Sequence, residues 1–117
     1  MKTVYKKAIS LANKNGKKYL KGLLSSYKFI GMEPENSSNW FIIITQSNET
    51  GKYFCFAISR YDSGGADSCF YGDIEHYIIQ KAENMCYHYF SGLRFWLRAN
   101  LIRAYEKQIK AKYNIKF

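Results

Sequence analysis

The chain has 117 residues and a formal net charge of +9, from 18 Lys and Arg against nine Asp and Glu. Its hydrophobic content of 47% and aromatic content of 18% exclude a disordered basic tail and predict a single folded domain over residues 1–117. The sequence shows neither a secretory signal nor an apolar run of membrane-spanning length, and its three cysteines form no CxxC motif. We therefore expect a cytoplasmic protein with reduced thiols and no membrane partner.

The charge is unevenly distributed along the chain. Residues 1–31 carry eight lysines and no acidic residue, residues 32–91 sum to −5, and residues 92–117 sum to +6. Basic segments of this kind attract polyanions and accelerate their encounter with the protein. The pattern indicates a class of partner, nucleic acid or a nucleoprotein, and does not identify a substrate.

Two helices are expected at the start of the chain. Apolar residues recur at helical spacing over residues 3–14, and helical character resumes over residues 17–26. Asn15-Gly16 between them is a typical helix stop. Gly22 weakens the helical pattern of the second segment.

Three strands are expected next, over residues 27–32, 40–46 and 52–60, followed by a loop over residues 61–72 that can include a short strand near its end. The second and third segments are apolar on both faces. One face is expected to carry the helices. The other is expected to be covered by more chain or by a second subunit, which predicts a possible homo-oligomer through the outer sheet face.

Two further helices are expected at the end of the chain. Asp73 is suited to cap the first, which runs to about residue 90, and Ser91-Gly92 separates it from the last helix, residues 93–113. The predicted fold class is α+β: an N-terminal helix or helices, a three-stranded antiparallel sheet and two C-terminal helices. This order resembles the α-β-β-β-α core of double-stranded-RNA-binding domains. Because the helix after the sheet begins with the acidic Asp73-Ile74-Glu75, where those domains are basic, the likeness concerns the fold alone.

The last predicted helix carries the first candidate site. Arg94 and Arg98 fall within its apolar arc, where an unpaired guanidinium is very costly. One alternative is that they form ion pairs with carboxylates from the acidic middle of the chain. The other is that they form an open clamp for a phosphate or an acidic partner. The candidate carboxylates are those of Asp67, Asp73, Glu75 and Glu83.

The same helix presents other residues suited to binding an anion. Arg103 and Lys107 lie on its polar face. Trp96 is expected near Arg103, where an indole can stack on a base or anchor an interface, or can pack on the preceding helix. A second candidate site is a lysine cluster near the start of the chain, which can contact a phosphate backbone without reading sequence or can be a solvated face. Its members are Lys14, Lys17, Lys18 and Lys21.

Catalytic and metal-binding patterns are weak. His76 and His88 are twelve residues apart on one predicted helix and point about 120° away from each other. No cofactor or metal is predicted, and no zinc spacing, phosphate loop or nucleophile motif is present.

The leading hypothesis is a non-enzymatic binding protein that docks on nucleic acid or a nucleoprotein. The abundance of Lys, Asn, Ile, Tyr and Phe is typical of AT-rich coding sequences, so a phage or mobile-element accessory protein fits, such as an inhibitor of a host nucleic-acid-guided defence. The alternatives are a small toxin-like ribonuclease, a protein that sequesters a small nucleotide between the sheet and the last helix, and a protein-binding module. The ribonuclease would use His76 or His88 with Tyr61 or Tyr71 and Arg60.

Overall fold

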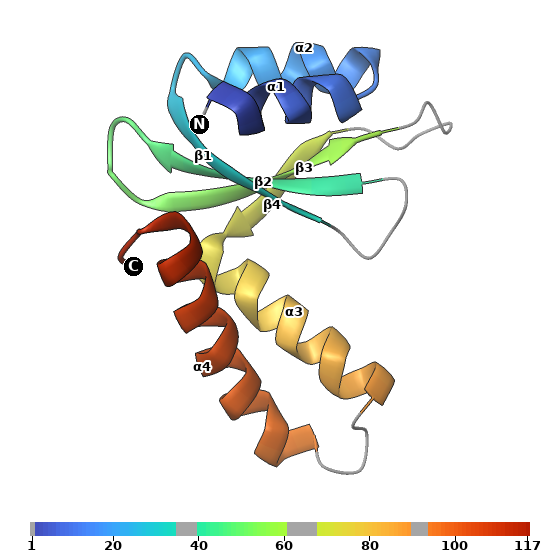
Figure 1. Cartoon of the computed structure of the whole chain (residues 1–117), viewed down its shortest axis with the longest axis vertical. Helices are drawn as coiled ribbons and strands as arrows, with labels where there is room; N and C mark the ends of the chain where they lie inside the picture. Colours follow the sequence, from blue (N-terminus) through green and yellow to red (C-terminus); the bar gives the residue numbers. More distant parts are fainter. Residues whose placement is uncertain (1, 35–39, 61–67, 90–93) are drawn as a thin grey trace. The chain divides into compact units, whose positions relative to one another are not determined.

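The computed structural model describes residues 2–34, 40–60, 68–89 and 94–117, with the side chains of residues 2, 34, 86–89 and 94–96 left aside (Figure 1). The chain forms two compact units, Met1–Gly72 and Asp73–Phe117.

The first unit consists of two helices and a sheet. The helices α1 (Lys2–Leu11) and α2 (Lys14–Leu23) precede the strands β1 (Tyr27–Pro34), β2 (Trp40–Ser47), β3 (Tyr53–Ser59) and β4 (Cys69–Asp73). The sheet order is β1-β2-β3-β4, with β1 and β3 antiparallel to β2. Both helices lie on the same face of the sheet (Figure 1).

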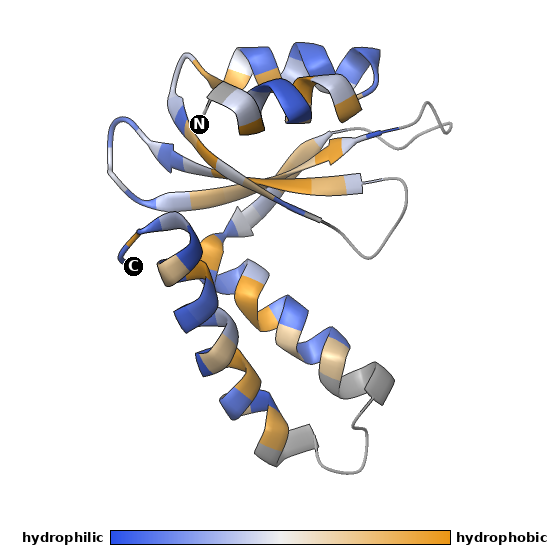
Figure 2. Cartoon of the chain, viewed as in Figure 1, coloured by the Kyte–Doolittle hydropathy of each residue, from blue (hydrophilic) through white to orange (hydrophobic). Residues whose placement is uncertain are grey.

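The core of this unit lies between the two helices and the sheet. The register pairs Phe41 with Ile58 and Ile43 with Phe56, which places all four side chains on one face. These residues pack in one cluster with small and apolar residues of the helices and β1 (Figure 2). The remaining buried members of the cluster are Ala8, Ala12, Leu20 and Phe29.

The opposite face of the central strands is also buried. The alternate residues Ile42, Ile44, Cys55 and Ala57 are each at most 7% exposed. This agrees with the expectation that both strong strands are covered on both faces. The predicted homo-oligomer through the outer face stays a prediction.

The break between the two N-terminal helices differs from the predicted one. Asn15-Gly16 does not end a helix but lies in the first turn of α2, because Asn13 caps that helix: its Oδ1 accepts from the Gly16 N–H at 2.7 Å. The Asn13 N–H in turn donates to the Ser59 carbonyl at 2.9 Å, which ties the start of α2 to the end of β3. A Cβ on Gly16 would lie only 2.9 Å from that same carbonyl oxygen, so glycine is needed there for close approach.

The second unit is a pair of helices, α3 (Ile74–Tyr89) and α4 (Arg94–Tyr113). Asp73 caps α3 as predicted, with its Oδ1 accepting from the His76 N–H at 2.7 Å. α4 ends at Asn114, whose φ of 53° is left-handed, and the Ile115 N–H donates to the Lys110 carbonyl at 3.2 Å. This hydrogen bond belongs to a Schellman motif, which turns the last residues back along the helix.

The α+β class, the helices at both ends and the antiparallel strands agree with the prediction, but the described sheet has four strands where three were expected. The additional strand, β4, lies at the end of the predicted loop, where a short strand was allowed for but not counted in the sheet. It has only five residues of mixed polarity, so it joins the sheet through backbone hydrogen bonds rather than an apolar pattern.

In the described part of the chain, no helix combines the length and the apolar character that crossing a membrane requires.

Candidate functional site

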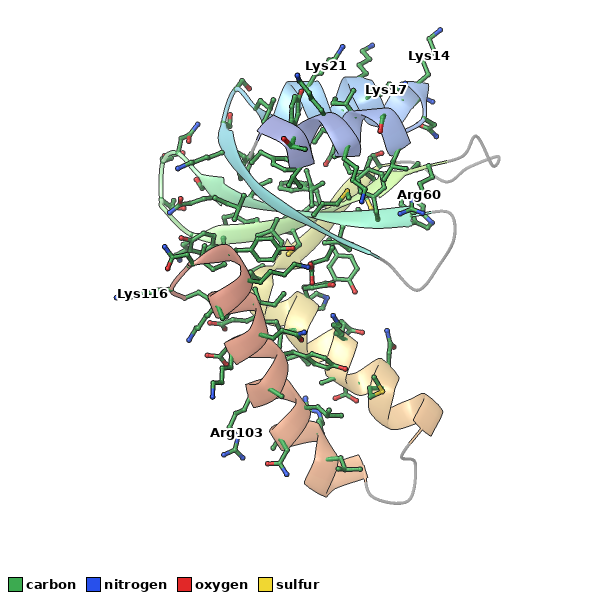
Figure 3. The ribbon with its side chains drawn as sticks, in the orientation of Figure 1. Lys14, Lys17, Lys21, Arg60, Arg103 and Lys116 are labelled. Atoms are coloured by element: carbon green, nitrogen blue, oxygen red, sulfur yellow. The ribbon has the colours of Figure 1, made fainter. Side chains whose placement is uncertain are left out.

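A stripe of four lysines runs along α2. Lys14, Lys17, Lys18 and Lys21 recur at intervals of three and four residues, so they share one face of the helix. All four are exposed, whereas Gly16 and Leu20 on the opposite face are buried against the sheet. In Figure 3 the labelled Lys14, Lys17 and Lys21 point away from the sheet. We call these four residues the lysine stripe.

The segment that carries the lysine stripe contains no acidic residue of its own. Residues 1–32 contain no Asp or Glu, and the first acidic residue, Glu33, is only 3% exposed. Within the described ranges, none of the salt bridges involves a stripe lysine. The first turn of α2 also lacks an acidic residue, so the positive end of the helix dipole adds to the field of Lys14 and Lys17.

An aromatic row begins beside this stripe. Tyr19 of α2 contacts Phe56 of β3 edge-on at 6.2 Å between ring centroids, and Phe56 contacts Phe70 of β4 at 5.5 Å. Phe70 is 56% exposed. Burial raises the pKa of the Tyr19 phenol above its ordinary value of 10.0, and charge on Cys69 and Tyr27 raises it further. Tyr19 therefore stays neutral at physiological pH.

The two predicted arginines of α4 have different outcomes. Arg98 forms an ion pair with Glu83 of α3, one of the four carboxylates named as candidate partners, so its charge is compensated within the second unit. Arg94 and Trp96 belong to α4, but their side chains lie outside the described residues. The clamp and the stacking indole therefore stay predictions.

Arg103 and Lys107 lie at an open hollow beside α4. The hollow measures about 540 Å³ and is formed by the second half of α4 and the segment that turns back at Asn114. Both residues are exposed, and the Arg103 Nε donates to the Ala99 carbonyl at 3.4 Å. Figure 3 shows Arg103 and Lys116 extending away from α3. The full lining is Arg103, Glu106, Lys107, Lys110, Ala111, Ile115 and Lys116.

The charges of this hollow are partly compensated. The Lys110 Nζ lies 2.7 Å from the Glu106 Oε1 and 4.9 Å from the centroid of the Phe117 ring. Sequence reasoning did not assign Lys110 and Lys116 to a site. The spacing of Arg103, Lys107 and Lys110 is a signal that can identify a basic helix face, but the placement of Lys116 depends on the turn at Asn114.

The structure describes only some of the residues considered for catalysis. His76 is exposed in the first turn of α3, and its backbone N–H is used by the Asp73 cap. The Arg60 guanidinium lies 5.5 Å from the centroid of the Phe41 ring. Tyr61 and the side chain of His88 lie outside the described residues. Among those described, no three His, Cys, Asp or Glu side chains are close enough to hold a metal ion.

Comparison of the chain with protein-family models, with curated proteins and with solved structures gives no match.

Proposed function

We propose that this chain is a non-enzymatic nucleic-acid-binding protein that contacts the phosphate backbone through the lysine stripe of α2. The observation that carries the proposal is the stripe itself: four exposed lysines on one helix face, in a segment of 32 residues without a carboxylate. Phosphate contacts of this kind provide affinity without sequence recognition.

The dimensions of the stripe suit a phosphate backbone. Lys14 and Lys21 are seven residues apart, and an α-helix rises about 1.5 Å per residue, so their Cα atoms are separated by about 10 Å along the axis. Base pairs are stacked about 3.4 Å apart, so the stripe spans about three steps of a strand. Flexible lysine side chains adapt to such a spacing as point charges.

The test is a titration of a fluorescently labelled oligonucleotide, followed by anisotropy over a series of salt concentrations. We expect Lys17→Gln/Lys21→Gln to reduce the slope of log affinity against log salt by about two, because each phosphate contact contributes about 0.9. The matched control is Lys28→Gln/Lys52→Gln, which removes the same charge from two exposed positions outside the stripe. Equal slopes for the two variants would show that binding follows net charge alone and would contradict the proposal.

The biological setting of the proposal comes from size and composition. A basic chain of 117 residues with a composition typical of AT-rich genes fits a phage or mobile-element accessory protein, for example an inhibitor of a host nucleic-acid-guided defence. Capture of partners from a cell lysate at low and high salt, with and without nuclease, separates the two forms of the proposal. Partners lost on nuclease treatment indicate docking on nucleic acid, and partners retained after it indicate a nucleoprotein surface.

The hollow beside α4 favours a second candidate function, the binding of a small phosphorylated ligand such as a nucleotide. Its volume lies within the range of small-molecule sites, and it combines the apolar Ala111 and Ile115 with four cations. Calorimetric titration with a mononucleotide tests it: binding should saturate at one ligand per chain and be lost in Lys107→Gln/Lys116→Gln. Unchanged binding in that variant would exclude the hollow as the site.

A further inference from the structure

Phe70 is an unusual surface residue. It is 56% exposed, and the only other large apolar side chain comparably exposed among the described residues is Leu24, at 37%. Phe70 belongs to β4, which lies at one end of the strand order β1-β2-β3-β4. An aromatic ring that is exposed at a sheet edge contributes little to the core and is available to a ligand.

The Phe70 ring is supported on its inner side by other rings. Its centroid lies 5.9 Å from that of Phe54 and 5.5 Å from that of Phe56. Phe56 is itself held by Tyr27 at 5.1 Å in an edge-to-face contact. Because the supporting rings fix its position, Phe70 can offer its exposed surface with little loss of conformational entropy on binding.

The aromatic row connects Phe70 with the helix that carries the lysine stripe. Tyr19, which contacts Phe56 at 6.2 Å, follows the stripe residue Lys18 directly in α2. All of these residues belong to the first compact unit. Cations that hold a phosphate backbone and an exposed ring that receives a base are the two components of single-strand binding sites.

We propose that Phe70 is a stacking platform for an unpaired base, so that the preferred ligand of the lysine stripe is single-stranded nucleic acid. This inference rests on the proposed function. In a duplex the bases are already stacked on one another, so an exposed ring gains little from them, whereas a base of a single strand is free to stack. Stacking is tolerant of sequence because every base has a π-face.

The experiment compares labelled oligothymidylate, which has little structure of its own, with a hairpin duplex, for the full chain and for Phe70→Ala. We expect Phe70→Ala to weaken binding of the single strand by about 5- to 150-fold, the range found for loss of one aromatic–base stack. The salt slope should not change, because no charge is removed. Binding of the duplex should change by less than about twofold.

Two control variants separate stacking from general loss of apolar surface. Phe70→Tyr keeps the ring and should bind the single strand as the unaltered chain does. Leu24→Ala removes the other exposed apolar side chain and should have no effect on either ligand. Circular dichroism of each variant establishes that the fold is retained, which is expected because more than half of Phe70 is already in solvent.

The outcomes distinguish this inference from the proposed function. Salt-dependent binding that is equal for both ligands and insensitive to Phe70→Ala would overturn the platform and leave the lysine stripe in place. Absence of binding to either ligand would overturn both. A second possibility is that Phe70 contacts protein: a fall in sedimenting mass on Phe70→Ala, with single-strand affinity unchanged, would assign the ring to a protein interface and overturn the platform.

Discussion

The helices α2 and α4 are both basic, but they present their charge in different ways. α2 carries its lysines on one face and has no acidic residue within its ten positions. In the second unit, Arg98 of α4 is paired with Glu83 and Lys110 with Glu106. Both helices have a net positive charge. The field that reaches an approaching anion, however, depends on whether a carboxylate lies beside each cation.

The helix dipoles increase this difference. The lysine stripe begins in the first turn of α2, where the partial positive charge of the helix N-terminus adds to it. The cations of α4 include Lys110 and Lys112 in the last turn, where they compensate the partial negative charge of the terminal carbonyls. Part of the positive charge of α4 thus stabilises the helix itself. The comparison therefore favours α2 over α4 as the surface for the polyanion binding that we propose.

The largest expected effect comes from removing the four cations of the lysine stripe, compared with removing four cations from α4 and the segment that follows it. We expect Lys14, Lys17, Lys18 and Lys21→Gln to lower oligonucleotide affinity about 100-fold at moderate salt, since four phosphate contacts are lost. Gln substitutions at Arg103, Lys107, Lys112 and Lys116 remove the same charge and should lower it about tenfold or less, because Glu106 lies among these residues. Anisotropy titrations at one salt concentration measure both. Equal losses would contradict the comparison.

The second effect concerns the placement of α2 on the sheet. Gly16→Ala should lower the free energy of unfolding by about 1–3 kcal/mol, because the added methyl group would meet the Ser59 carbonyl oxygen at 2.9 Å. Gly22→Ala in the same helix should raise it by about 0.5–1 kcal/mol, because nothing lies within 4 Å of its Cβ position. Urea unfolding followed by circular dichroism measures both. Equal destabilisation would show that close approach at Gly16 is not the cause.

The two glycines also show which parts of the fold can be predicted from the sequence and which cannot. The apolar runs of β2 and β3 and the apolar stripes of the helices predicted those elements to within a few residues. A buried face requires apolar residues at the spacing of the helix or strand, and this spacing is visible in the sequence. The predicted position of the break between α1 and α2 was wrong. The dipeptide Asn15-Gly16 is typical of a helix stop, but here it lies in the first turn of α2. Its actual role depends on Asn13 and Ser59, which are distant in sequence and meet only in the fold.

The candidate sites were predictable to different degrees. The lysine stripe was apparent because all four residues lie within one helix. An ion pair of Arg98 with one of four carboxylates was one of two alternatives, and only the packing of α4 on α3 selects Glu83. Phe70 was not considered, because β4 lacks the alternation of a half-buried strand and its exposed ring is defined by tertiary neighbours. Lys116 was missed because the left-handed turn at Asn114 directs the chain back to α4.

A smaller effect is expected when a carboxylate is placed beside a cation of α2, as Glu106 lies beside Lys110 in α4. Asn15 is exposed in the first turn of α2, three residues before Lys18. Asn15→Glu should raise the stability by about 0.3–1 kcal/mol, because a carboxylate is favourable at a helix N-terminus. It should also reduce the salt slope of binding by about one, since Lys18 gains a competing partner. Stability and affinity would then move in opposite directions, which thermal unfolding and anisotropy of one protein preparation can measure.

The smallest effect is expected at the ion pair of α4. The side chains of Arg98 and Glu83 are 41% and 37% exposed, so a double-mutant cycle with Arg98→Gln and Glu83→Gln should give a coupling energy of only about 0.2–1 kcal/mol. Because Glu83 already compensates its charge, Arg98→Gln should change oligonucleotide affinity by less than about twofold, whereas Glu83→Gln frees the guanidinium and should increase affinity slightly. Arg98→Gln could instead reduce the salt slope as much as loss of a stripe lysine does. That result would show that a neighbouring carboxylate does not decide which cations bind phosphate, and it would contradict the distinction between α2 and α4.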